Sequence, residues 1–379
     1  MSVVTNSAAT SKFDTAKLGL ILIVACVIAG LAAFDWWLAG TEKAEMQKAA
    51  ERAYRNGMDL LRNGRTADAV DSLRTAHALE RGNEQYELGL IESLIAASKT
   101  SEADPLMNEV LQQKPNDGLA NLIAARLMTQ KGQFHDAEAY YHRAIYGEWP
   151  DDAPKHRIAA RMELIQLLQN HGNQQDVLAE VIPLEQEAVN NEPLQLKLAH
   201  LLLVSGSPSR SAELYNAILE RDPQNVAAYL GLAEADLQRG DYRAAHTNFL
   251  HAYHHDENDS WIRSRLELSS ELATLDPTLR QLSSLEKYRR SVRILELARN
   301  DLQQCLSSEP KADPGNLQQL LSSAGKMVSA KTPKHATNEM AERMLTLAED
   351  VWRARLKACG AITTRHEEPL RLVMQKLAQ

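Results

Sequence analysis

The sequence predicts an all-α protein in which one apolar helix precedes an array of repeated helix pairs and a further helical segment. Three observations support this fold class. Small and bulky apolar residues recur with a period of 34 residues over the middle of the chain. A stretch of 21 residues near the N-terminus carries a single charge. Beyond residue 259 the period disappears, whereas the helical spacing of apolar residues continues.

The composition is that of a folded, acidic protein. The 379 residues are 44% hydrophobic and carry a formal net charge of −8, so they can bury a core. The negative charge argues against a nucleic-acid partner, because basic surfaces are needed to neutralise phosphates. Three cysteines without a CxxC pair exclude a disulfide-stapled scaffold and a zinc ribbon.

Residues 18–39 are predicted to form a transmembrane helix. The stretch begins LGLILIVACVIAGLAAFDWWL, in which only Asp35 is charged. At ~1.5 Å per residue it is long enough to cross a hydrocarbon layer of ~30 Å. Trp36 and Trp37 lie where an aromatic belt is expected. We therefore expect a single-pass protein of the inner (cytoplasmic) membrane that contacts the bilayer through this segment.

The N-terminal tail, residues 1–17, predicts the orientation. It is short and carries Lys12 and Lys17 next to the membrane segment. Such tails normally stay in the cytoplasm, and long downstream domains cross the membrane largely regardless of their charge. We expect the large domain in the periplasm. More lysines and arginines follow the segment than precede it, so a cytoplasm-facing regulatory scaffold is the alternative.

Two kinds of N-terminal processing compete with a permanent anchor. Cys26 follows Ile23, Val24 and Ala25 in a sequence that resembles a lipoprotein cleavage box, although apolar residues follow it where a polar tether is usual. Residues 30–32 offer only a weak site for ordinary signal cleavage.

The 34-residue period indicates stacked helix pairs. The recurring positions are Ala69, Leu73 and Ala76, then Ala103, Met107 and Val110, then Ala137, Tyr141 and Ala144. Small residues let two helices pack closely, and the bulky residue between them fills the space toward the next pair. Because one pair cannot cover its own apolar face, several pairs must stack.

Residues 226–259 carry the clearest unit, and this unit resembles a tetratricopeptide repeat. Its signature residues are Gly240, Tyr242, Ala245, Phe249 and Ala252. Six such units cover just over half the chain: 50–83, 84–117, 118–151, a divergent 158–191 that follows an insertion of about six residues near 152–157, 192–225 and 226–259. The resemblance implies a right-handed superhelix, an α-α solenoid, with a concave groove.

Residues 260–379 are predicted to form a capping helix and a helical C-terminal module. An open-ended array needs a cap, and Trp261–Leu275 has the apolar spacing to provide it. Further helices are expected at Pro277–Ser307, 317–330, 338–359 and 369–378.

No arrangement of residues predicts catalysis, so we expect no enzyme activity, no cofactor and no metal site. His251 and His255 share a helix face at metal-ligand spacing, but they lie near a helix C-terminus, where cations are favoured anyway. A metal-binding or catalytic protein is the weaker alternative. Cys305 and Cys359 could pair in an oxidising compartment, but we expect two separate buried thiols.

The resemblance also implies where partners bind. In that family, inward-facing positions on the first helix of each pair hold a peptide segment or a partner helix. In this sequence these positions are Tyr54, Met58, Leu88, Glu92, Leu122, Arg126, Met162, Gln166, Leu196, His200, Leu230 and Glu234. Chaperone-binding members grip a carboxylate with several basic residues, but Arg126 is the one strongly basic member of this set. The set therefore suits an amphipathic helix or an apolar extended peptide. Some of these leucines could instead belong to the core between repeats.

Together these observations predict a membrane-anchored scaffold or adaptor that binds partner proteins during the assembly of a bacterial cell-envelope complex. They do not identify the partner.

Overall fold

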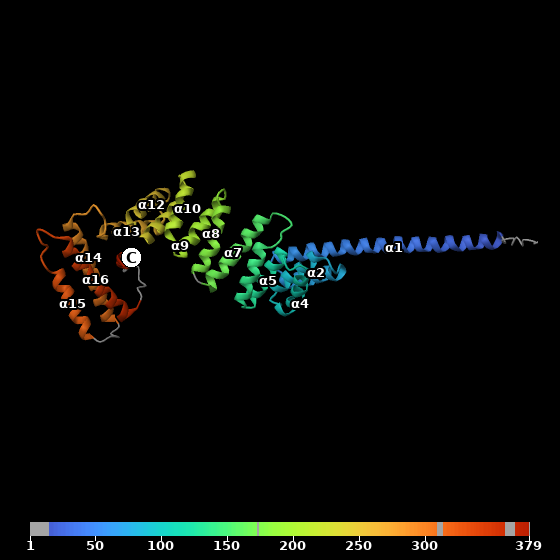
Figure 1. The fold of residues 1–379 in the computed structure, drawn as a ribbon, viewed down its shortest axis with the longest axis horizontal. Helices are drawn as coiled ribbons and strands as arrows, with labels where there is room; N and C mark the ends of the chain where they lie inside the picture. The colour runs from blue at the N-terminus through green and yellow to red at the C-terminus, as the bar shows by residue number, and fades with distance from the viewer. Residues whose placement is uncertain (1–14, 173, 309–313, 361–367, 379) are drawn as a thin grey trace, which may run out of the picture. The chain divides into compact units, whose positions relative to one another are not determined.

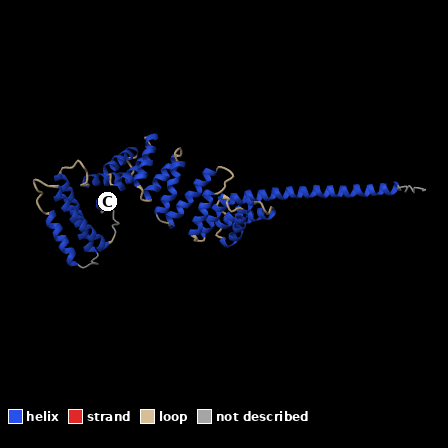
Figure 2. Cartoon of the chain, in the orientation of Figure 1, coloured by secondary structure: helices blue, strands red, loops and turns tan. Residues whose placement is uncertain are grey.

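The computed structural model describes residues 15–172, 174–308, 314–360 and 368–378. Across these ranges all regular secondary structure is helical, apart from one isolated bridge between Asp117 and Glu148 (Figure 2). The predicted all-α fold is confirmed.

The helices group into two compact bodies, Met1–His171 and Gly172–Gln379. The N-terminal body contains α1 (Thr15–Arg62), α2 (Thr66–Leu79), α3 (Glu84–Ala96), α4 (Thr100–Gln113), α5 (Gly118–Gln130), α6 (Phe134–Tyr146) and α7 (Ala153–His171). The C-terminal body contains α8 (Gln174–Glu187), α9 (Glu192–Val204), α10 (Pro208–Arg221), α11 (Val226–Arg239), α12 (Tyr242–His255), α13 (Ser260–Leu275), α14 (Ser284–Ser308), α15 (Pro314–Val328), α16 (Asn338–Cys359) and α17 (Glu368–Leu377). The division therefore falls inside the divergent unit 158–191, whereas the sequence suggested a boundary after residue 259.

Helix α1 carries the apolar segment into the first helix pair without a break (Figure 1). The sequence suggested two elements, 18–39 and a helix from residue 50. Residues 41–49, TEKAEMQKA, are mostly strong helix formers, and the cost of Gly40 in a helix, about 1 kcal/mol, is too small to interrupt them. Every side chain from residue 23 to residue 48 is exposed, and Ala50 is the first to be buried.

The recurring positions of the 34-residue period form the core of the helix pairs. All twelve of them, in the first three units and in 226–259, are at least 96% buried. The chain turns between paired helices at Gly64, Gly132 and Gly240, each with a φ of 74°, which glycine adopts readily. In the second pair Ser98, with a φ of 59°, takes this place.

The insertion before the fourth pair lengthens a helix. Helix α7 has 19 residues, whereas α3, α5 and α9 have 13 each. It begins at Ala153, directly after Asp152, whose φ of 41° is unusual for a residue other than glycine. Most of the inserted residues therefore form the first turn and a half of α7.

Helix α13 packs on α12 as the expected cap, but the next helix begins later than predicted. Residues 277–283 are not helical, and α14 starts at Ser284. The Asp276 carboxylate accepts hydrogen bonds from the Thr278 amide at 2.8 Å and the Thr278 hydroxyl at 2.7 Å, which holds the chain in a turn. The Ser283 hydroxyl then accepts from the Glu286 amide at 3.2 Å and caps the new helix.

Helices α14 and α16 lie side by side and run parallel, and a disulfide joins Cys305 to Cys359 with the two Cα atoms 6.3 Å apart. The expectation of two separate thiols was wrong. One turn earlier on each helix, the buried Arg355 Nε lies 3.0 Å from Asp301 Oδ2. The two matched pairs fix the register of the helices, which the sequence did not reveal.

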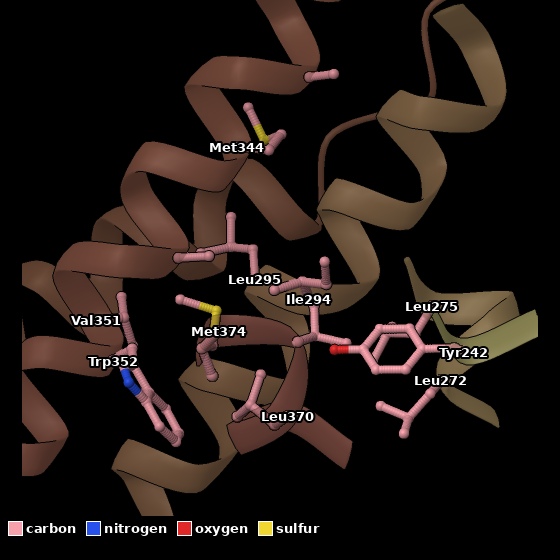
Figure 3. Packing of buried hydrophobic residues seen from close by; sticks show 14 of the residues in the cluster. Tyr242, Leu272, Leu275, Ile294, Leu295, Met344, Val351, Trp352, Leu370 and Met374 are labelled. Carbon is pink, nitrogen blue, oxygen red and sulfur yellow. The ribbon is translucent and has the colours of Figure 1, made fainter. Parts of the chain in front are cut away.

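Helix α17 returns to the last helix pair. Leu370, Val373 and Met374 are buried in the core of the C-terminal body, where Figure 3 shows Leu370 and Met374 near Trp352. The Tyr242 hydroxyl donates to the Leu372 carbonyl at 2.9 Å. Lys376 Nζ donates to the Gly240 carbonyl and to Asp276 Oδ2, both at 2.7 Å.

Candidate docking site

Three of the predicted groove residues in the N-terminal body line one cavity. Tyr54, on α1, and Leu88 and Glu92, on α3, surround a cavity of about 340 Å³ together with Leu119 on α5 and Trp149 on the loop after α6. Leu119 is 39% exposed although it is apolar. An open, partly apolar cavity of this size can accept one or two side chains of a partner.

Beside this cavity, Arg126 on α5 links three helices, α3, α5 and α7, each of which is the first helix of its pair. Its Nη1 donates to Glu92 Oε1 on α3 at 3.1 Å. Its Nε and Nη2 donate to the two carboxylate oxygens of Glu163 on α7 at 2.9 and 2.7 Å. We call Glu92, Arg126 and Glu163 the first acid–arginine ladder. Paired guanidinium–carboxylate hydrogen bonds fix geometry as well as charge, so the ladder holds the spacing of the helices that face the cavity.

Burial and charge alter the protonation of this region. Burial raises the pKa of Glu92, Arg126 lowers it and Glu163 raises it, and the net direction is upward. Burial, aided by Glu163, also raises the pKa of Tyr141 to about 12. The hydrogen bonds to Glu163 raise the pKa of Arg126, so the guanidinium stays charged. The ladder therefore contains two acidic groups for one cation.

Not every predicted groove residue faces this cavity. Leu122 is 5% exposed, so it belongs to the core, which was the alternative for such leucines. Met58 and Met162 are half-buried, and Gln166 is exposed. On α7 the residue that contacts Arg126 is Glu163, next to the predicted Met162. The groove positions on α7 were placed 40 residues after those on α5, which is the 34-residue period plus the insertion of about six residues, whereas Glu163 lies 37 residues after Arg126.

The loop that carries Trp149 was also missed. It closes the unit 118–151, just before the insertion, and none of the recurring positions or predicted groove positions falls on it. The signal that could have indicated an ordered loop is the pair Trp149–Pro150. Its two residues are bulky and rigid, which is unusual in a linker.

In the C-terminal body the predicted groove residues lie in different environments. Leu196 packs partly into the core around Ala199, and His200 is exposed. Leu230 packs partly against the core that contains α17. Glu234 accepts two hydrogen bonds of 2.6 Å from Arg265 on α13.

Arg265 completes a second acid–arginine ladder with Glu234 and Glu368. Its Nη1 donates to Glu368 Oε1, at the start of α17, at 3.0 Å. Burial opposes its charge, but the hydrogen bonds to Glu234 and Glu368 raise the pKa of Arg265 overall. Glu368 on α17 thus has the same role in the second ladder that Glu163 on α7 has in the first. The predicted groove residue Glu234 is therefore bonded within the chain itself.

The ring of His251 stacks on Tyr229 with 4.9 Å between centroids. Among the described residues there is no group of three or more His, Cys, Asp or Glu side chains placed to hold a metal ion.

One described helix, α1 from Ile23 onward, is long and apolar enough to cross a membrane. The described part of the chain buries none of its apolar window. Trp36 is 82% exposed and Ile23 is 64% exposed. This exposure separates α1 from the core helix of a soluble protein, which buries its apolar residues.

Comparison with known proteins identifies a repeat family in part of the chain. The model of the tetratricopeptide repeat family matches residues 196–252. Residues 196–252 therefore contain tetratricopeptide repeats. The match includes α11 and most of α12, whose residues carried the resemblance in the sequence. Proteins with these repeats typically mediate contacts between proteins, and the helix pairs of this chain belong to that architecture.

The curated relatives are longer proteins. A putative cellulose synthase operon protein C of Escherichia coli O157:H7 is 27% identical over 184 residues, which cover 48% of this chain and 16% of the relative. Cellulose synthase operon protein C of Escherichia coli K12 is 26% identical over 184 residues, with the same coverage. The protein of that name in Salmonella typhimurium LT2 is 26% identical over 176 residues, or 46% of this chain and 15% of the relative. The chain thus spans less than a fifth of these relatives.

Two solved structures are similar to this chain at low sequence identity. A structure from a study of Pseudomonas aeruginosa pilF has 14% identity and a TM-score of 0.40, covering 60% of this chain and 99% of the other. A tetratricopeptide repeat protein from Parabacteroides merdae has 15% identity and a TM-score of 0.31, covering 86% of this chain and 99% of the other.

Proposed function

We propose that this protein is a non-catalytic scaffold, anchored in the inner membrane by α1, that binds a partner protein through the concave side of its repeats during assembly of a bacterial envelope complex. The observation that carries the proposal is the uninterrupted α1. Its exposed apolar half fits a bilayer, and its second half is the first helix of the repeat array. No flexible linker separates anchor from array, so the array stays close to the membrane and to partners held there.

The cavity beside the first acid–arginine ladder supports docking in the N-terminal body. Groove positions on α1 and α3 line it, and exposed apolar surface at Leu119 remains uncovered by the described residues. By contrast, α17 contacts α11, and Leu230 of α11 packs against the core that contains α17, which makes the last repeat a poorer docking surface.

The disulfide between Cys305 and Cys359 supports an extracytoplasmic location for the repeats. Disulfides persist in the periplasm and are rare in the reducing cytoplasm. This agrees with the orientation expected from the short positive tail. The partial likeness to cellulose synthase operon proteins supports an envelope process that handles polysaccharide, with the repeats of this chain as the accessory part.

Affinity purification of the full-length protein from its native membrane tests the docking function. We expect Leu119→Glu to remove the co-purifying partner, because it places a charge on the open apolar surface of the cavity. Leu79→Glu is the matched control, since Leu79 has a similar exposure of 37% but lies at the end of α2, away from the cavity. Equal recovery of the partner with both variants would refute docking at this site.

Orientation is tested separately with reporter fusions after residue 379. We expect alkaline phosphatase, which is active only in the periplasm, to be active, and a cytoplasmic reporter to be inactive. The reverse result would support the cytoplasm-facing alternative.

A further inference from the structure

The loop from Gly147 to Asp152 is a rigid wall of the cavity in the N-terminal body. The Gly118 amide donates to the Glu148 carbonyl at 2.8 Å, and the Glu148 amide donates to the Asn116 carbonyl at 2.9 Å. The indole Nε1 of Trp149 donates to the Ala144 carbonyl at 2.9 Å. These bonds tie both the backbone and the side chain of the loop to its neighbours.

The aromatic surface of this wall is held in one orientation. The Trp149 ring stacks on His156 with 4.6 Å between centroids and 6° between planes. The ring also lies against Gly118, where a Cβ atom would overlap it. On α1, the ring of Tyr54, which also lines the cavity, packs on Tyr86 with centroids 5.0 Å apart. Two aromatic residues that line the cavity, Trp149 and Tyr54, are therefore held in place by their neighbours.

The charges of the cavity have one sign. Its lining includes the carboxylates of Glu84, Glu92, Asp117 and Asp151, and no lysine or arginine is among the described residues that line it. Lys114 pairs with Glu84 from outside the lining. Arg126 is shared between Glu92 and Glu163, as described above. These two cations are fewer than the four carboxylates, so the lining of the cavity is acidic.

We propose that this cavity binds an arginine side chain of the partner protein, carried on a segment with an apolar neighbour. The inference rests on the docking function proposed above and specifies its partner. A guanidinium is planar, stacks on aromatic rings and forms paired hydrogen bonds with carboxylates. Its methylene stem would contact Leu88 and Leu119, while its head faces Glu92 and Asp151. The cavity thus combines the three surfaces that an arginine recognises.

Fluorine NMR of the full-length protein in lipid nanodiscs tests this directly. The tryptophans are replaced with 5-fluorotryptophan, and the resonance of residue 149 is assigned with Trp149→Phe. The probes are N-acetyl-Leu-Arg-amide, the same peptide with citrulline, which has the shape of arginine without its charge, and the same peptide with glutamate. We expect a saturable shift of the residue-149 resonance with the arginine peptide and at least tenfold weaker binding of the citrulline peptide.

The acidic side chains provide matched variants. Glu92→Gln combined with Asp151→Asn should weaken binding of the arginine peptide at least tenfold. Asp71→Asn removes an exposed carboxylate of α2 that does not line the cavity, and it should change nothing. Equal responses to arginine and citrulline, a response to the glutamate peptide, or no response of the residue-149 resonance would overturn the proposal. If partner recovery still depends on Leu119 in that case, the docking function stands and only the arginine assignment falls.

Discussion

Arg126 is the residue on which the geometry of the candidate site depends most. It connects α3, α5 and α7 through hydrogen bonds to two carboxylates that face each other across it. Without the guanidinium these partly buried acids would repel each other. The sequence indicated Glu92 and Arg126 as groove residues, but it did not indicate that they bond to each other.

We expect Arg126→Ala to lower the free energy of unfolding by about 1–2 kcal/mol, because the pair is only half-buried and solvent screens part of its energy. Urea unfolding followed by circular dichroism measures the loss. Arg74→Ala is the control: Arg74 pairs with Glu102 at 2.9 Å, but both side chains are about half exposed, so its loss should stay below about 0.5 kcal/mol. Equal losses would show that the ladder has no special structural role.

Gly118 is required by the ring that packs on it. We expect Gly118→Ala to cost about 1–3 kcal/mol, since the new methyl group would displace Trp149. Gly325→Ala, on a helix with room for the methyl group, should stabilise by about 0.5–1 kcal/mol instead. Thermal unfolding compares the two variants, and the residue-149 fluorine resonance should move in the first only. A stable Gly118→Ala variant would mean that Trp149 is not fixed there.

Asp236 makes stability depend on pH. Burial raises the pKa of its carboxyl from 3.8 to about 6, against the opposing effects of Arg239 and Asn248. The folded state therefore holds a proton that the unfolded state has lost. This contribution to stability is complete below pH 4 and disappears as the pH rises through 6. We expect the stability of Asp236→Asn relative to the wild type to increase by about 2 kcal/mol between pH 4 and pH 7.5 in urea unfolding. A difference that does not change with pH would contradict the raised pKa.

At the scale of elements, the sequence correctly predicted the features that depend on the 34-residue period. The helix pairs follow from small residues at fixed spacing, and Ala69, Ala103, Ala137 and Ala245 are all fully buried. What it missed depends on contacts between distant segments. Tyr242 and Leu372, which bond to each other, are 130 residues apart, and Glu163 lies beyond an insertion. No local pattern contains such information.

The disulfide is an element-scale feature with a measurable effect. The two cysteines are 54 residues apart in the sequence, and the segment between them includes all of α15 and most of α16. Constraining a segment of this length in the unfolded chain stabilises by about 3–4 kcal/mol. We expect Cys305→Ser with Cys359→Ser to lose that amount and to make α14–α16 susceptible to limited proteolysis. An unchanged cleavage rate, with the wild type shown to be oxidised, would contradict this role.

At the scale of the whole molecule, α1 joins two physical environments in one helix. The described residues bury none of its apolar window, whereas its final turns, around Tyr54 and Met58, pack against the repeat core. Membrane anchoring and partner docking therefore depend on the same helix, and the bilayer sets the position of the cavity.

Photocrosslinking in native membranes tests this central claim most directly. A photoreactive residue is placed at position 119 in the full-length protein, and at position 79 as the control. The account predicts a specific protein crosslink from position 119 only, which weakens strongly when residues 18–39 are replaced by a cleavable secretion signal that releases the array into the periplasm. Crosslinks of equal intensity from both positions, or a crosslink from position 119 that is unaffected by release, would contradict it.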